Sequence, residues 1–315
     1  MSSHGKRESL RILVTGSSGV LGRRIAPALE ALGHRVVPFD IREPDRGAPP
    51  LTHSHDVRNL SAVQEAVEKV DGVIHLAAVS RVAPAEADPA HAHSVNVEGT
   101  RTVLEALRHG HSAAWFILAS SREVYGEPTV LPVDENHRLN PKGVYGRTKV
   151  EGEQTVRKHA ETEGRRAVIL RYTNVYGSPT DYPERVIPSF VTAALRGEPL
   201  EVRGPDKLLD FLHIDDAVGA VREAIRCLEE SKGSGFDVFN IASGRGITLG
   251  NLAKKVIEAT RSHSPVRVAS SMDWEISSYV GNVAKAERVL SWKPTVEFDR
   301  GLKELARETL RLRAR

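Results

Sequence analysis

Cysteine, long apolar runs and an excess of either charge are all scarce in this 315-residue chain. The single cysteine, Cys227, excludes an intrachain disulfide and indicates a reducing compartment. No apolar stretch approaches the length that spans a membrane, and residues 1–9 are polar and lack the apolar centre of a signal peptide. The sequence therefore predicts a cytoplasmic protein.

The charges are balanced, with 44 Lys and Arg against 41 Asp and Glu. Because the two signs are interspersed, no basic surface of the kind that binds nucleic acid or membranes is predicted. We expect a small-molecule partner instead. The 13 histidines suggest a metal site, but the pairs His53/His55 and His91/His93 have no third ligand at a suitable spacing. A zinc site needs three or four protein ligands, so we expect no metal.

Short β-rich runs alternate with longer helical patterns from Arg11 onward. Predicted strands cover residues 12–14, 35–39, 72–76, 114–119 and 167–172, and predicted helices cover residues 20–32, 60–70, 89–108 and 144–163. This alternation is typical of an α/β protein with a parallel sheet. The sequence thus predicts a doubly wound sheet of the Rossmann type.

The pattern changes after Gly177, where prolines break the chain into short pieces. Two further runs, residues 210–214 and 238–241, are predicted to be strands that return to the sheet. The expected dinucleotide-binding domain covers residues 10–177, with returning strands from about 204–245. A smaller C-terminal substrate-binding lobe is expected from residues 178–203 and 246–315.

A tyrosine and a lysine stand four residues apart in the predicted helix 144–163. Tyr145 and Lys149 therefore share one helix face, with the ammonium close to the phenol. A nearby cation lowers the pKa of a phenol from about 10 toward neutrality, where it acts as a general base. The serines that end the predicted strand 114–119 stand where α/β sheets bind ligands, so one of them is placed to hydrogen-bond the same substrate hydroxyl. A Tyr and a Lys at this spacing also occur by chance.

Glycines follow the first predicted strand, in Thr15-Gly16-Ser17-Ser18-Gly19-Val20-Leu21-Gly22. In a turn between strand and helix, glycines let the backbone approach a pyrophosphate at the helix N-terminus. Asp40 ends the second strand, where a carboxylate accepts from the ribose hydroxyls of NAD and repels the extra phosphate of NADP. Arg42 is also able to hold that phosphate, so NAD is favoured without excluding NADP. Asp56 is placed to accept from the adenine amino group, although an Asp that only starts a turn has the same pattern.

Eight segments together carry a family resemblance. They are Gly16 to Gly22, Asp56-Val57, His75-Leu76-Ala77-Ala78, Asn96-Val97-Glu98-Gly99-Thr100, Ser120-Ser121-Arg122-Glu123-Val124-Tyr125-Gly126, Tyr145-Gly146-Arg147-Thr148-Lys149, and Arg171 to Gly177 followed by Val186-Ile187-Pro188. In this order the chain resembles an extended short-chain dehydrogenase/reductase of the NAD-dependent nucleotide-sugar epimerase/dehydratase family, similar to UDP-sugar 4-epimerases. The resemblance covers nearly the whole length.

The resemblance implies a role for each matching residue. The implied catalytic residues are Ser121, Tyr145 and Lys149. The implied NAD-binding residues are Gly16, Ser18, Gly19, Val20, Leu21, Gly22, Asp40, Ile41, Arg42, Asp56, Val57, Leu76, Ala77, Ala78, Asn96, Ser120, Tyr145, Lys149 and Tyr172. The implied substrate-binding residues are Ser80, Ser121, Arg122, Glu123, Tyr145, Asn174, Arg185 and Val186.

Departures from the family pattern bear on the reaction. The family's 4,6-dehydratases carry an Asp-Glu pair after the catalytic hydroxyl residue, whereas this chain has Arg122-Glu123, so the resemblance implies no dehydration. Glu123 alone is compatible with decarboxylases and epimerases, or is simply the ion-pair partner of Arg122. Leu209 stands where the family has an arginine for the diphosphate, and residues 272–275 lack the usual Arg-x-x-Asp/Glu. Other cations must then bind phosphate. The candidates are Arg185, Arg203 and Lys207, and Arg185 is alternatively placed to meet a uronic acid carboxylate.

Three functions follow as hypotheses. The first is an NAD-dependent nucleotide-sugar 4-epimerase that acts on a UDP-hexose or UDP-hexuronate through a transient 4-keto sugar. The second is a nucleotide-sugar decarboxylase or keto-sugar reductase of the same fold. The third is a non-catalytic cofactor-sensing protein. The resemblance also implies a homodimer, with the helices 89–108 and 144–163 of two copies in one bundle.

Overall fold

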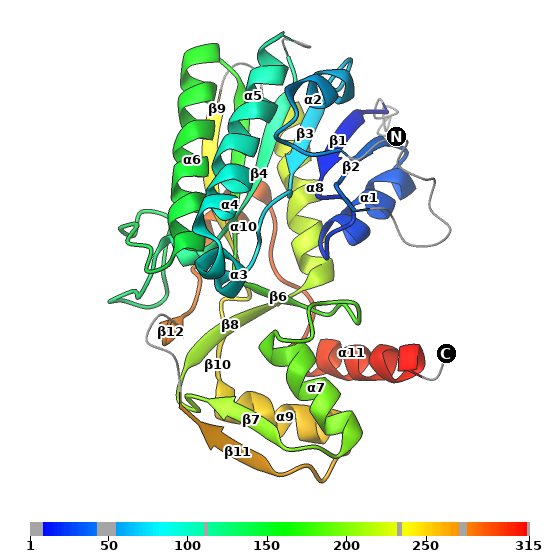
Figure 1. The fold of residues 1–315 in the computed structure, drawn as a ribbon, viewed down its shortest axis with the longest axis vertical. Coiled ribbons are helices and arrows are strands. Elements are labelled where there is room, and N and C mark those ends of the chain that lie inside the picture. Colours follow the sequence, from blue (N-terminus) through cyan, green and yellow to red (C-terminus); the bar gives the residue numbers. More distant parts are fainter. Residues whose placement is uncertain (1–8, 43–54, 110–112, 232–234, 271–275, 314–315) are drawn as a thin grey trace, which may run out of the picture. The chain divides into compact units, whose positions relative to one another are not determined.

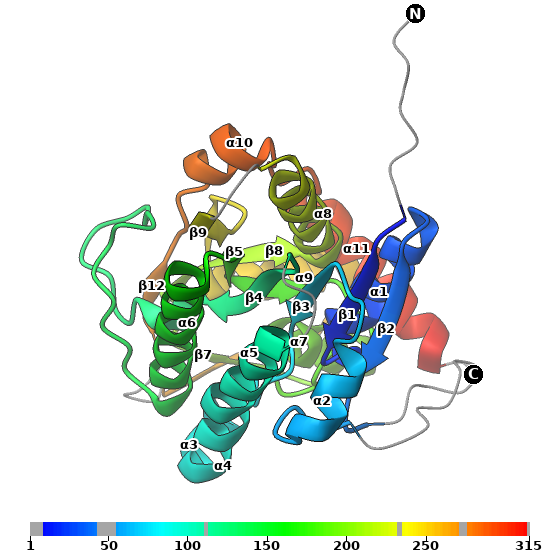
Figure 2. The ribbon, with the colours of Figure 1, turned by 90° about the horizontal axis from the view of Figure 1, so that it is seen from above.

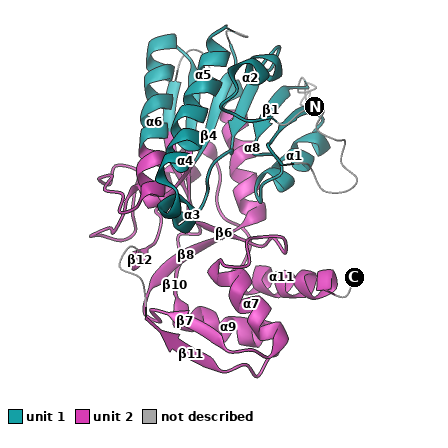
Figure 3. Ribbon diagram, viewed as in Figure 1, with its two compact units in different colours: residues 1–119, 151–169, 228–237 teal, residues 120–150, 170–227, 238–315 magenta. Residues whose placement is uncertain are grey.

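The structure is a computed structural model that describes residues 9–42, 55–109, 113–231, 235–270 and 276–313. The predictions made for residues 1–8, for His53 and for residues 272–275 lie outside this range. The chain divides into two compact units (Figure 3). Unit 1 comprises Met1–Ala119, Glu151–Ile169 and Leu228–Asp237, and unit 2 comprises Ser120–Val150, Leu170–Cys227 and Val238–Arg315.

The elements alternate along the chain as Figure 1 shows. The strands are β1 (Arg11–Thr15), β2 (Arg35–Phe39), β3 (Gly72–His75), β4 (Trp115–Ser121), β5 (Arg166–Tyr172), β6 (Asn174–Tyr176), β7 (Leu200–Arg203), β8 (Leu208–His213), β9 (Gly235–Ile241), β10 (Gly246–Thr248), β11 (Val266–Ala269) and β12 (Ser278–Tyr279). The helices are α1 (Gly22–Ala31), α2 (Leu60–Ala66), α3 (Val82–Ala87), α4 (Pro89–His93), the π-helix η1 (Ser94–Glu98), α5 (Gly99–His109), the 3-10 helix η2 (Arg122–Val124), α6 (Val144–Glu163), α7 (Val186–Arg196), α8 (Ile214–Glu230), α9 (Leu249–Thr260), α10 (Ala284–Leu290) and α11 (Phe298–Arg313).

The main sheet has six strands in the order β2-β1-β3-β4-β5-β9 and is parallel, of the doubly wound Rossmann type. The chain leaves β1 for β2 on one side and later enters β3 on the other. Ligands bind at such a switch point, outside the carboxyl ends of the strands. Strands buried on both faces are apolar throughout, and Ile12, Leu13 and Val14 are fully buried. Figure 2 shows α5 and α6 side by side, and Arg108 pairs with Glu163 at 2.9 Å between them.

Unit 2 holds a smaller sheet in the order β10-β8-β12, with β6 beside β8, and a two-stranded sheet of β7 and β11. Its apolar core draws Phe190 from α7, Leu252 from α9 and Leu305 from α11. The alternation in β7 is that of a half-buried strand, because Leu200 and Val202 are buried while Glu201 and Arg203 are exposed.

Most predicted elements of the main sheet are confirmed, and α6 has the predicted bounds. The predicted helix 89–108 is instead α4, η1 and α5 in succession, interrupted by the π turn. The prediction that residues 210–214 return to the main sheet is wrong. That segment forms β8, which pairs with β6, β10 and β12, whereas β9 does join the main sheet. None of the helices in the described ranges is both long and apolar enough to cross a bilayer.

Candidate active site

The glycine turn of unit 1 follows β1 tightly. Gly16 has φ of 70°, a left-handed conformation that favours glycine, and its N–H donates to the carbonyl of Phe39 at 2.8 Å. A Cβ at Gly16 would lie 2.7 Å from the backbone nitrogen of Ala77, and one at Gly22 would overlap the carbonyl oxygen of Gly16. The turn therefore packs closely against the end of β3 and opens α1 beside it. A helix N-terminus that starts from such a turn fits a pyrophosphate.

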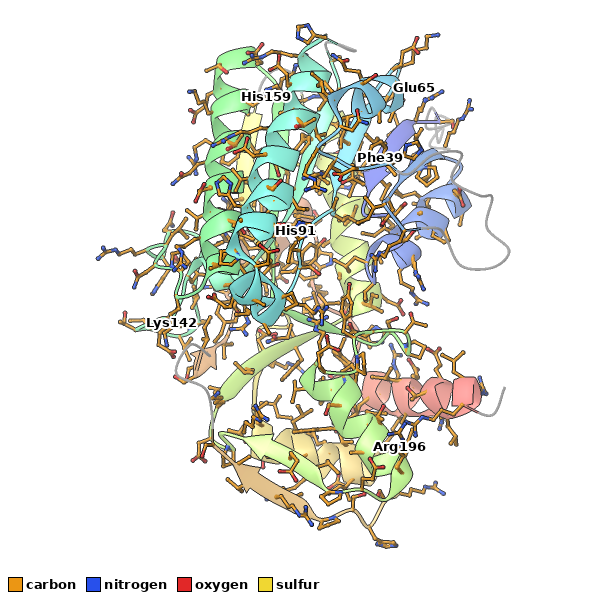
Figure 4. The ribbon with its side chains drawn as sticks, in the orientation of Figure 1. Phe39, Glu65, His91, Lys142, His159 and Arg196 are labelled. Carbon is orange, nitrogen blue, oxygen red and sulfur yellow. The ribbon has the colours of Figure 1, made fainter. Side chains whose placement is uncertain are left out.

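Asp40 is anchored to this turn at the end of β2. Its carboxylate is buried, accepts from the N–H of Ser18 at 2.9 Å and from the N–H of Arg42 at 2.9 Å. The Arg42 side chain is half exposed and lies 3.5 Å from the same carboxylate. The positive charge of Arg42 is thus partly compensated by Asp40, which favours a ribose hydroxyl over a 2′-phosphate at this position. His55 stacks on Phe39, the last residue of β2, which Figure 4 labels, and their ring centroids are 4.7 Å apart.

Asp56 takes part in a local ion pair. Both of its oxygens accept from the guanidinium of Arg58, and its pKa is lowered chiefly by that hydrogen bond. The carboxylate also accepts from the Arg58 N–H at 2.9 Å, as an Asp at the start of a turn does. Its neighbour Val57 is buried and packs against Gly99. A Cβ at Gly99 would lie only 2.7 Å from a Val57 methyl. Adenine binding by Asp56 stays a prediction.

A buried chain of hydrogen bonds crosses unit 1 through His75. Thr100 donates to the carbonyl of Asn96 at 2.6 Å, so its oxygen accepts from Nε2 of His75 at 3.1 Å. His75 then carries its proton on Nε2, and Nδ1 accepts from the Thr15 hydroxyl at 2.8 Å. The Thr15 oxygen in turn accepts from the N–H of Ala77 at 3.3 Å. The chain joins the ends of β1 and β3 to the start of α5.

The π turn η1 aims Asn96 at the segment after β3. Its amide oxygen accepts from the N–H of Val79 at 2.8 Å, and its amide nitrogen donates to the Val79 carbonyl at 3.2 Å. This double contact fixes the backbone between Leu76 and Ser80. π turns occur often at functional sites, because the extra residue redirects side chains. Residue-level NAD contacts stay predictions.

Unit 2 brings together the three predicted catalytic residues. Ser121 ends β4 and is the N-cap of η2, where its side-chain oxygen accepts from the N–H of Glu123 at 3.2 Å. The Ser121 hydroxyl hydrogen-bonds the phenol of Tyr145 in the first turn of α6. The Lys149 ammonium lies 5.8 Å from the centre of the Tyr145 ring. Both Tyr145 and Lys149 are buried.

The titration of Tyr145 differs from the sequence prediction. Burial raises its pKa to about 12, while the hydrogen bond from Ser121 and the charges of Arg185 and Arg122 lower it and the charge of Glu123 raises it. The prediction that the pKa of Tyr145 lies near neutrality is therefore wrong. The reason is desolvation, which outweighs the neighbouring cations.

Three predicted substrate residues form a connected group beside Ser121. The Nη2 atom of Arg122 lies 3.0 Å from a Glu123 oxygen and donates to the Asn174 amide oxygen at 3.4 Å. The Asn174 amide nitrogen donates to the carbonyl of Asp210 at 2.9 Å. Arg185 pairs separately with Asp181, at 3.2 Å and 3.3 Å from its two oxygens.

The sequence argument missed a buried polar network behind η2. The Tyr125 hydroxyl donates to the Asn240 amide oxygen at 2.7 Å and accepts from Arg171 at 2.9 Å. Tyr279 stacks on Tyr125 with ring centroids 6.1 Å apart. Only Tyr125 and Arg171 lay inside matched segments, and nothing in the sequence paired them. Of the remaining predicted residues, Ser80 is exposed, and buried Tyr172 donates to the Ala217 carbonyl at 3.5 Å.

The predicted residues divide between the units. Unit 1 carries most predicted cofactor residues, and unit 2 carries Ser120, Tyr172, the catalytic three and most of the predicted substrate residues. Across the parts of the chain that the structure covers, His, Cys, Asp and Glu side chains form no group of three that could hold a metal.

Comparisons with known proteins show the family of the chain. A family model described as "NAD dependent epimerase/dehydratase family" matches residues 12–242. A UDP-glucose 4-epimerase from Rhizobium leguminosarum bv. trifolii is 30% identical over 312 residues, which cover 91% of this chain and 93% of that protein.

Two solved structures extend the comparison to the fold. A UDP-glucose 4-epimerase from Thermotoga maritima, with UDP-glucose, superposes with a TM-score of 0.86 at 27% identity and covers 97% of this chain and 100% of its own. A UDP-glucuronic acid 4-epimerase from Bacillus cereus, in complex with UDP-glucuronic acid and NAD, has a TM-score of 0.87 at 25% identity and covers 96% and 100%.

Proposed function

Because the chain belongs to the NAD-dependent epimerase/dehydratase family, we propose that it is a nucleotide-sugar 4-epimerase acting on a UDP-hexose or a UDP-hexuronate. NAD is the cofactor of this family, and it accepts a hydride from the sugar when bound. The glycine turn of unit 1 packs closely against the end of β3 and opens α1, and a tight glycine turn between strand and helix fits a dinucleotide. The residues proposed to hold it are those of the turn, Asp40 and the segment fixed by Asn96.

The observation that carries the proposal is the group of Ser121, Tyr145 and Lys149, of which Tyr145 and Lys149 are buried. In its ionised form, Tyr145 takes the proton of the sugar C4 hydroxyl and becomes the neutral phenol, and Ser121 hydrogen-bonds the phenol oxygen. The proton on Tyr145 returns to the sugar oxygen when the 4-keto sugar is reduced on its other face. Epimerisation therefore has no net proton or redox change, and the bound cofactor is regenerated.

Two alternatives are weaker for stated reasons. A keto-sugar reductase needs exchangeable NADPH, which the buried carboxylate of Asp40 disfavours. A non-catalytic sensor would not need Ser121, Tyr145 and Lys149 together. A decarboxylase is the second candidate. Arg122 stands where a dehydratase of this family has its Asp, and Glu123 beside Tyr145 is compatible with decarboxylation.

Replacing Tyr145 tests the proposal. We expect Tyr145→Phe to reduce turnover at least about 100-fold, since it removes the general base, while NAD stays bound. Purified wild-type protein is incubated with UDP-glucose, UDP-galactose and the two UDP-hexuronates without added NAD, and products are identified by NMR. Conversion to the 4-epimer supports the proposal. Release of CO2 supports the decarboxylase, and wild-type activity in Tyr145→Phe removes Tyr145 from the mechanism.

The proposed assembly is a homodimer in which residues 89–108, which form α4, η1 and most of α5, and the helix α6 of each copy make one bundle. This extends the sequence prediction, and the assembly is measured directly by light scattering at working concentration. A monomer would contradict it.

A further inference from the structure

One side of the Arg122 guanidinium is engaged by neighbouring side chains, and the other side is buried without an acceptor among the described residues. Its Nη2 atom contacts Glu123 at 3.0 Å and Asn174 at 3.4 Å. Its Nη1 atom is buried and has no hydrogen-bond partner among the described residues. The residue as a whole is 8% exposed. A buried donor without an acceptor is costly, and in a binding site it indicates a group that the ligand supplies.

The guanidinium is held in place by its surroundings. The Tyr279 ring lies under it, with its centre 5.7 Å from the guanidinium carbon, and is itself fully buried. The segment that carries Tyr279 is tied down by Glu127, which accepts from the N–H of Ser277 at 2.9 Å and from the N–H of Ser278 at 3.1 Å. Arg122 is therefore preorganised, and little entropy remains to be lost when its Nη1 side binds an acceptor.

The unpartnered donor belongs to a residue whose charge acts on the reacting hydroxyl of Tyr145. Arg122 directly follows Ser121, and its charge acts on the Tyr145 phenol together with that of Arg185. Arg185, however, contacts both oxygens of Asp181, a carboxylate whose side chain is only 1% exposed. Arg185 makes both contacts through Nη1 and its side chain is 33% exposed, so of these two described cations only Arg122 has a buried donor without an acceptor.

We propose that Arg122 is a specificity-determining residue whose Nη1 side binds the carboxylate of an acidic sugar, so that the preferred substrate is a UDP-linked hexuronate. This inference rests on the proposed function. Guanidinium groups pair with carboxylates through parallel N–H donors, and a neutral hydroxymethyl group offers a weaker acceptor. The diphosphate is the other anion of such a substrate, and the test separates the two.

The test compares two substrates that differ only at this group. The ratio of kcat/KM for UDP-glucuronate to kcat/KM for UDP-glucose is measured in the wild type and in Arg122→Met. We expect the wild type to favour UDP-glucuronate and the variant to lose about 30-fold of that ratio, which is the size of one charge-assisted hydrogen bond. Arg185→Met is the comparison variant, and it is expected to change kcat/KM for both substrates to a similar extent.

Two further variants guard against misfolding, since Arg122→Met leaves Glu123 without its partner. Arg122→Lys keeps the charge but not the forked donors, and the double variant Arg122→Met with Glu123→Gln removes both charges. Both are expected to lose the preference. Circular dichroism and NAD content report folding.

Each contrary result has a separate meaning. Failure of the wild type to convert either sugar, with NAD retained, overturns the proposed function and this inference with it. Conversion of UDP-glucose with an unchanged ratio in the Arg122 variants overturns the inference alone. A parallel loss of affinity for UDP itself in Arg122→Met, measured by calorimetry, assigns Arg122 to the diphosphate and also overturns it.

Discussion

The carbonyl oxygen of Glu123 lies 2.6 Å from the point where a Cβ on Gly146 would stand. Only a glycine lets the first turn of α6 approach η2 this closely, because real Cβ atoms need more space. The contact places the residue before Gly146, Tyr145, beside the residue that caps η2, Ser121. Two elements distant in sequence thus meet at one backbone contact that positions the phenol and the serine.

Replacing Gly146 by alanine should separate these elements. We expect Gly146→Ala to lower the free energy of unfolding by about 1–3 kcal/mol through overpacking and to lower kcat, because Tyr145 moves away from Ser121. The matched control is Gly152→Ala in the same helix, where the nearest atoms to a Cβ lie 3.8 Å and 3.9 Å away. That substitution should leave stability equal or slightly higher. Urea unfolding and steady-state kinetics measure both, and equal effects of the two variants would contradict the prediction.

The neighbours of Tyr145 should move its ionisation in opposite directions. The hydrogen bond from Ser121 lowers the pKa of Tyr145, and the charge of Glu123 raises it. Proton transfer to Tyr145 requires its ionised form, so the rate of sugar oxidation should rise with pH. In Ser121→Ala this rise should shift to higher pH, and in Glu123→Gln to lower pH. Single-turnover formation of NADH across pH measures the shift, and a shift of both variants in one direction would refute the assignment.

Asp210 should make stability depend on pH. Burial raises its pKa to about 6, although hydrogen bonds from Ser243, Gly244 and Gly281 lower it. The unfolded chain has the ordinary value of about 4, so between these values the folded state binds more protons than the unfolded one. The free energy of unfolding should therefore fall by about 3 kcal/mol as pH rises from about 4 to about 6.

Two variants isolate the contribution of Asp210. Asp210→Asn should be less stable at every pH, because the new side-chain NH2 group would face backbone N–H donors. Its stability should not depend on pH between about 4 and about 6. Ser243→Ala removes one hydrogen bond to the carboxylate and should extend the slope to higher pH. Urea unfolding at several pH values gives the comparison, and an unchanged slope in Asp210→Asn would assign it to another group.

Thr100 should matter through His75 rather than through volume. Thr100→Val keeps the shape but removes the hydroxyl oxygen that lies 3.1 Å from Nε2 of buried His75. We expect a loss of about 1–3 kcal/mol in the free energy of unfolding and less NAD retained on purification. Thr100→Ser keeps the hydroxyl and serves as the control. Equal NAD content in the Val and Ser variants would show that the hydrogen bonds through His75 do not support cofactor binding.

Local patterns in the sequence determined much of this protein. The bounds of α6 follow from helical periodicity, and the turn from Gly16 to Gly22 follows from glycine spacing, because each depends on neighbours within a few residues. The Rossmann sheet and the family were also predicted correctly, since alternating elements and the order of motifs are visible in the chain itself.

Contacts between distant segments decided the rest. The short strands of unit 2, including the placement of β8 outside the main sheet, depend on partners far along the chain that no local pattern names. The pKa of Tyr145 rose instead of falling because burial is a sum over all surrounding elements, whereas the i, i+4 spacing reveals only Lys149. The unpartnered donor of Arg122 also depends on contacts between distant segments. Its charge is visible in the sequence, but which of its nitrogens find acceptors is fixed only when Glu123, Asn174 and Tyr279 close around it.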